Sequence, residues 1–129
     1  MKKLFLAAAL AATLSPSVAF ADVNEALENI CSIVKADDTS ELRKKMRVVQ
    51  SEYKLRLGDF YQGVSCGGLS LIRHAVSNGA IEAGELMIKK MRKSDLETPE
   101  SDGQTLQQWL STNGHAGSNL ATVLAERIS

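Results

Sequence analysis

The sequence predicts a small all-α domain of five or six short helices, built from helix–turn–helix pairs and one disulfide. Apolar residues recur at helical spacing through most of the chain after residue 21. A motif in residues 68–79 returns in residues 103–114 at a constant offset of 35. Two cysteines are also 35 residues apart. No segment after residue 21 approaches the ~20 consecutive apolar residues that a membrane helix needs.

Residues 1–21 have the pattern of a cleavable secretory signal peptide. Two lysines precede an apolar run over residues 4–14, which is too short to cross a bilayer. Ala19 and Ala21 supply the small residues that signal peptidase reads, so we expect cleavage before Asp22. The sequence therefore predicts a periplasmic or secreted protein.

The remaining residues 22–129 have the length of a single domain with one core. Without the two leader lysines, 13 basic residues stand against 15 acidic ones, a net charge of −2. Such a balance argues against nucleic acid as a partner, because polyanion binding depends on excess positive charge.

Cys31 and Cys66 are the two cysteines of the chain. In an oxidising compartment an even number predicts a disulfide, and the chain-entropy estimate for this loop is about 3.8 kcal/mol of stabilisation. The alternatives are two buried thiols or a redox pair. Redox motifs usually place their cysteines two residues apart, which favours the structural bond.

The first predicted helix covers residues 23–34, with Asp22 and Glu25 as a capping box. A polar break at residues 37–40 then offers caps for a second helix, predicted over residues 42–60. Residues 53–57 also alternate like a strand, but no partner strand is evident, so we favour helix. Gly58 is the expected place for a break or kink.

Each copy of the repeated motif predicts a pair of helices. Ser70 and Thr105 are placed to cap the first helix of each pair, and an Asn-Gly turn follows it. The second helices are expected over residues 81–91 and 118–128, with a loop at residues 94–103 between the pairs. The predicted turn glycines are Gly67, Gly68, Gly79, Gly103 and Gly114.

The first copy resembles an ankyrin repeat in its order of Gly68, Ser70, Ala75, Gly79 and Glu82. The second copy, through Gly103, Thr105, Gly114 and His115, is similar over fewer positions. Leucine replaces the proline of the ankyrin pattern in both copies, and the period is 35 rather than 33. The resemblance implies ankyrin-like helix pairs.

A second resemblance covers residues 30–96. Cys31, an Asp-Asp break, a basic helix, the Phe60-Tyr61 pair and Cys66-Gly-Gly follow one another in order, and Ser70 to Ala75 completes the pattern. This order is similar to a family of small exported gammaproteobacterial proteins known only as a domain of unknown function. The resemblance implies that both cysteines and the glycine turn matter, and it implies no activity.

Candidate catalytic residues are few. His74 and His115 have no standard zinc-ligand spacing with the cysteines, so we expect no metal and no cofactor. Ser70 and His74 share a helical face like a nucleophile and its base, but no acidic residue is placed to orient the histidine. Helix capping is the simpler role for Ser70. We therefore expect that the protein is not an enzyme.

Two basic clusters occur at residues 43–47 and 89–93, and each could bind phosphates or anionic lipid. With a net charge of −2, we favour solvated helix faces for both. The function we expect is non-catalytic binding of another envelope protein or a small ligand. The alternative is a redox or enzyme-accessory role for Cys31 and Cys66.

Overall fold

The computed structural model describes residues 23–129, and all regular structure in this range is helical except one isolated bridge between Cys66 and Leu69. The elements are α2 (Ile30–Lys35), α3 (Thr39–Tyr53), α4 (Leu57–Phe60), the 3₁₀ helix η1 (Tyr61–Gly63), α5 (Leu71–Ser77), α6 (Ile81–Lys90), α7 (Lys93–Leu96), α8 (Leu106–Thr112) and α9 (Asn119–Ile128). The all-α prediction is confirmed for these residues. The predicted number of five or six helices is wrong, because eight α-helices, α2–α9, are bounded within the described range.

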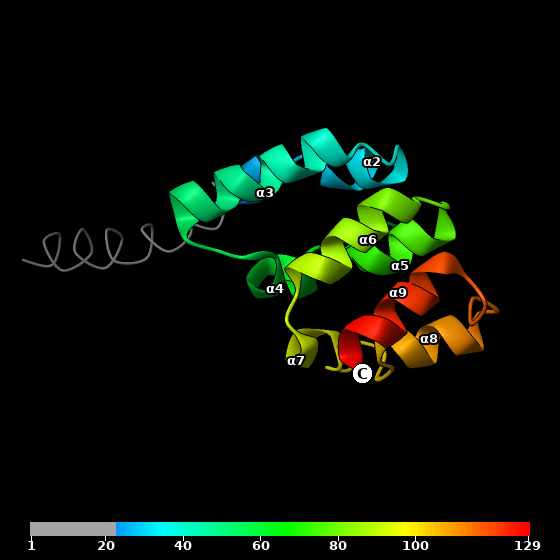
Figure 1. Ribbon diagram of the computed structural model, residues 1–129. Helices are drawn as coiled ribbons and strands as arrows, with labels where there is room; N and C mark the ends of the chain where they lie inside the picture. The colour runs from blue at the N-terminus through cyan, green and yellow to red at the C-terminus, as the bar shows by residue number, and fades with distance from the viewer. Residues whose placement is uncertain (1–22) are drawn as a thin grey trace, which may run out of the picture.

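Three helix pairs lie on one another in a stack (Figure 1). The pair α2–α3 packs on α5–α6, through α2 against α5 and α3 against α6. The pair α5–α6 in turn packs on α8–α9, with α6 against α9. Gly84 of α6 permits this last approach, since a β-carbon there would collide with Leu120. The buried side chains of the three pairs form one core.

The repeat seen in the sequence is a repeat of local structure. The first helices, α5 and α8, have seven residues each at the offset of 35. Asn78 and Asn113 end them alike, since each side-chain amide donates to a helix carbonyl four residues back. Gly79 and Gly114 then adopt φ of 66° and 78°, the left-handed region that glycine enters without steric cost. The first helices of the two pairs and the turns that follow them are therefore equivalent.

Both N-terminal helices are interrupted where we predicted continuity. Residues 23–26 are helical, but a turn at residues 27–29 separates them from α2, with Asn29 at φ 67°. The Asp22 half of the predicted capping box lies outside the described residues. The predicted helix over residues 42–60 starts at Thr39 and stops at Tyr53. Its break is at Lys54, with φ 59°, and not at Gly58, which is inside α4.

Two further expectations about local structure are corrected. The segment predicted as a loop, residues 94–103, contains most of the one-turn helix α7. Ser70 occupies the N-cap position of α5 but makes no capping bond there, because its hydroxyl faces Tyr61 instead. Thr105, in contrast, forms the full capping box of α8 with Gln108.

Candidate functional site

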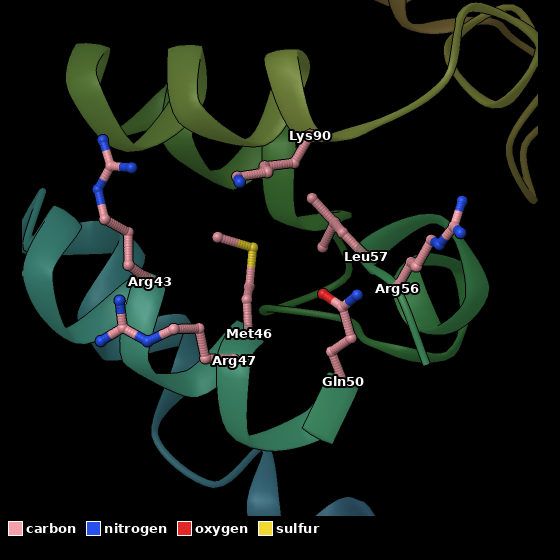
Figure 2. A pocket seen from close by; sticks show the side chains of 7 residues that line it. All are labelled: Arg43, Met46, Arg47, Gln50, Arg56, Leu57 and Lys90. Atoms are coloured by element: carbon pink, nitrogen blue, oxygen red, sulfur yellow. The ribbon is translucent and has the colours of Figure 1, made fainter. Parts of the chain in front are cut away.

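A groove between α3, α4 and α6 gathers positive charge from segments far apart in the sequence (Figure 2). Helix α3 supplies four of its lining residues at positions 43, 46, 47 and 50, a spacing that puts them on one helical face. The full lining is Arg43, Met46, Arg47, Gln50, Arg56, Leu57 and Lys90, around a cavity of about 260 Å³. Four of these seven side chains are cationic and none is acidic.

The other groove residues are placed by the ends of two helices. Lys90 is the last residue of α6, and its side chain extends into the gap toward Met46 of α3 (Figure 2). Arg56 precedes α4, and its backbone N–H donates to the Asp59 carboxylate over 2.8 Å, which fixes the start of that helix. Leu57, the first residue of α4, is buried beneath the groove. Met46 and Leu57 therefore form an apolar floor, with Arg43, Arg47 and Lys90 on one side and Arg56 beyond Leu57 on the other (Figure 2).

Within residues 23–129, the groove cations form no ion pairs with the acidic side chains of the protein. Over residues 23–129, the ion pairs within 4.0 Å involve Arg73, Lys89 and Arg92, and none involves a groove cation. A depression continuing toward Lys54 shares Arg47 and Arg56 with the groove and is also lined without an acid. On the other side of Arg43, the next hollow includes Glu82 and Glu85, so the acid-free surface ends there.

A second polar cluster is buried between α5 and the loop after α7. The Tyr61 hydroxyl lies 2.8 Å from Oγ of Ser70 and 3.0 Å from Oε2 of Glu100. Burial, together with the charge of Glu100, raises the pKa of Tyr61, so the phenol stays protonated and available as a donor. Arg73 lies beside the same carboxylate, with Nε 3.0 Å from Oε1 of Glu100 but without the direction of a hydrogen bond. This cluster holds the loop onto α5.

The rings of His74 and His115 have different partners, and the hydroxyl of Ser70 contacts Tyr61 rather than His74. Nε2 of His74 lies 3.0 Å from the carbonyl oxygen of Cys31, and its Nδ1 is 3.3 Å from the Asn78 amide. His115 stacks on Trp109, with ring centroids 5.5 Å apart. In the part of the chain that the structure describes, no group of three or more His, Cys, Asp or Glu side chains is arranged to ligate a metal.

Cys31 and Cys66 form the predicted disulfide, which ties α2 to the turn before α5. The turn glycines predicted from the sequence, Gly67, Gly68, Gly79, Gly103 and Gly114, all have positive φ. The cleavage residues Ala19, Ala21 and Asp22 lie outside the described residues. No helix within residues 23–129 combines the length and apolarity needed to span a bilayer.

Comparison with known families identifies the family of this chain. The family described as a protein of unknown function (DUF3718) matches residues 30–98, which is more than half of the chain. The protein belongs to the DUF3718 family. No curated protein and no solved structure matches the chain.

The DUF3718 segment contains the disulfide and every residue of the basic groove. It ends before Glu100 and before the helix pair α8–α9. The groove thus lies wholly within the matched residues 30–98, whereas the buried cluster around Arg73 also includes residues after them. Sequence reasoning found Arg43, Arg47 and Lys90 only as members of two separate clusters. It missed Arg56 and the apolar floor. The helical spacing of α3 could indicate that Met46 lies beside the arginines, but Arg56 and Leu57 lie outside that helix.

Proposed function

We propose that this DUF3718 protein is an exported, non-catalytic binding module whose groove between α3, α4 and α6 holds an anionic ligand. The observation that carries the proposal is the lining of four cations and no acid. Arginine guanidinium groups bind carboxylate and phosphate through paired N–H donors, so three of them at one groove favour an anion with several oxygens.

Export is supported by the leader pattern in residues 1–21 and by the disulfide, which persists in oxidising compartments. A non-catalytic role is supported by the contacts of Ser70 and His74, which face Tyr61 and the Cys31 carbonyl rather than each other. Cys66 is 5% exposed, which favours a structural bond over reversible thiol exchange.

The test is titration of the protein, produced from the full chain, with inorganic pyrophosphate while backbone amide NMR shifts are recorded. We expect shifts concentrated in α3, at the start of α4 and at the end of α6. Replacing Arg43 and Arg47 together by glutamine removes two charge-assisted contacts and should weaken binding by about tenfold or more.

The matched control is the pair Lys44→Gln and Lys45→Gln. It removes the same charge from the same helix, but neither lysine lines the groove. We expect its affinity for pyrophosphate to stay within about twofold of the unmodified protein, because neither lysine makes a direct charge-assisted contact with an anion in the groove. Equal weakening by both double variants, or shifts spread over the whole surface, would show that the groove is not the site.

A further inference from the structure

The floor of the groove is apolar, and this limits what the ligand can be. Met46 is partly buried and Leu57 is 4% exposed, and both face the cavity that the cations line. A small hydrated anion gains little from such a floor, whereas a hydrocarbon group placed on it leaves water. Positive charge at the rim and an apolar surface beneath it suit a ligand that has both an anionic group and a hydrocarbon part.

The charge of the groove indicates the head of that ligand. Four cations without an acid exceed what a single carboxylate can balance. A phosphate monoester carries about −1.5 to −2 at neutral pH, and its oxygens fit the arginine forks. Lys90, the fourth cation, enters from α6 on the opposite wall and adds a point charge (Figure 2).

We infer that the groove binds an amphiphilic phosphate monoester, with the phosphate among Arg43, Arg47 and Lys90 and the adjoining apolar part on Met46 and Leu57, toward Arg56. This inference rests on the proposed function and specifies its ligand class. The cavity of about 260 Å³ holds a phosphate and a short apolar portion. The depression toward Lys54 leaves an open path for the rest of the molecule. A lipid headgroup and a soluble phosphate ester share this chemistry.

The deciding comparison uses the unmodified protein and two probes, inorganic phosphate and octyl phosphate below its micelle concentration. We expect octyl phosphate to bind about tenfold or more tightly, since burial of two methylene groups accounts for that factor. Equal affinities would overturn the inference and leave the proposed anion site intact. Failure of both phosphates and of pyrophosphate to bind would overturn the proposed function as well.

Two variants then test whether the preference for octyl phosphate over inorganic phosphate arises at the apolar floor. Met46→Gln keeps the length of the side chain and should remove most of the preference for octyl phosphate over inorganic phosphate. The control Val48→Gln alters an exposed apolar residue of the same helix outside the groove and should change neither affinity. If Met46→Gln keeps the full preference, the apolar part does not lie on this floor and the inference fails.

A third arm distinguishes the two sources. Vesicles of phosphatidylcholine are compared with vesicles of phosphatidylcholine and phosphatidic acid in equal amounts. Selective binding to the second kind, lost in the Arg43→Gln and Arg47→Gln variant, supports the inference with a lipid headgroup as the source. Binding of octyl phosphate but of neither vesicle supports it with a soluble ester. Vesicle binding without octyl phosphate binding would overturn it, because adsorption to a charged surface would then suffice.

Discussion

At the residue scale, Arg73 organises the interior of the C-terminal half. It is 5% exposed, and its guanidinium donates to both carboxylate oxygens of Asp102 over 2.7 and 3.0 Å. The same group lies over the Trp109 ring at 5.2 Å. Burial alone would lower the pKa of Arg73, but the bond to Asp102 and the charge of Glu100 raise it above its usual value. The cation is therefore retained inside the fold.

Asp102 makes this contact sensitive to acid. The hydrogen bond from Arg73 lowers the pKa of Asp102 from 3.8 to about 2 in the folded protein. Because the unfolded chain binds the proton more readily, the contribution of this pair is complete above about pH 4 and is lost as the pH falls toward 2. We expect Asp102→Asn to lower stability at neutral pH and to flatten the acid slope of the unfolding free energy. Urea unfolding across this pH range measures both, and an unchanged slope would contradict the assignment.

The sequence did not reveal this cluster. Arg73 lies within the repeated motif of residues 68–79, and its partners Glu100 and Asp102 belong to a segment predicted as loop. Their meeting depends on how the loop after α7 folds back on α5, which no local pattern encodes. The disulfide was easier to predict, since Cys31 and Cys66 are the two cysteines present.

At the scale of the element, the sequence predicted helix type better than helix ends. Tyr53, Leu57 and Phe60 keep helical spacing across the break, so the periodicity hides it. The break depends on Lys54 in the left-handed region, which lysine rarely adopts. A lysine in the sequence therefore does not indicate such a break. The polar residues before α3 also bind the start of a different helix, which we did not expect. Asp38 caps α3, but Asp37 accepts from the Ala83 N–H in the first turn of α6 over 2.6 Å.

Lys54 gives a prediction for this element boundary. A non-glycine residue at φ 59° is strained by about 1 kcal/mol, which glycine avoids. We expect Lys54→Gly to raise the free energy of unfolding by about 0.5–1 kcal/mol, measured by urea denaturation. The matched control is Lys44→Gly in the interior of α3, which should lower it by about 1 kcal/mol. A loss of stability in both variants would show that the strain at Lys54 is offset by its other contacts.

At the scale of the whole molecule, the groove exists because α3 packs on α6 and α4 closes one end. The two basic clusters were interpreted separately as solvated faces, and part of each is used otherwise. Lys89 pairs with Glu85, and Arg92 with Asp95, while Lys90 alone of that cluster lines the groove. Composition and spacing could predict helices and cations. They could not predict which cations meet, because that depends on how α3, α4 and α6 pack on one another.

The disulfide is the covalent link between the first two layers of the stack. It joins Cys31 of α2 to Cys66, the residue before the Gly-Gly turn that leads into α5. The packed helices α2 and α5 already form part of one core, so removing the bond mainly enlarges the freedom of the unfolded chain. We expect the double variant Cys31→Ser and Cys66→Ala to fold with the same helical content but to lose about 4 kcal/mol of unfolding free energy.

Urea denaturation with and without reductant measures this loss. Reductant should bring the unmodified protein to the stability of the double variant and should leave the variant itself unchanged. The slope of the unfolding free energy with urea should rise in the variant, because an unfolded chain without the cross-link exposes more surface. Equal stability of the oxidised protein and the variant would mean that packing of α2 on α5 holds the first two layers together without the bond.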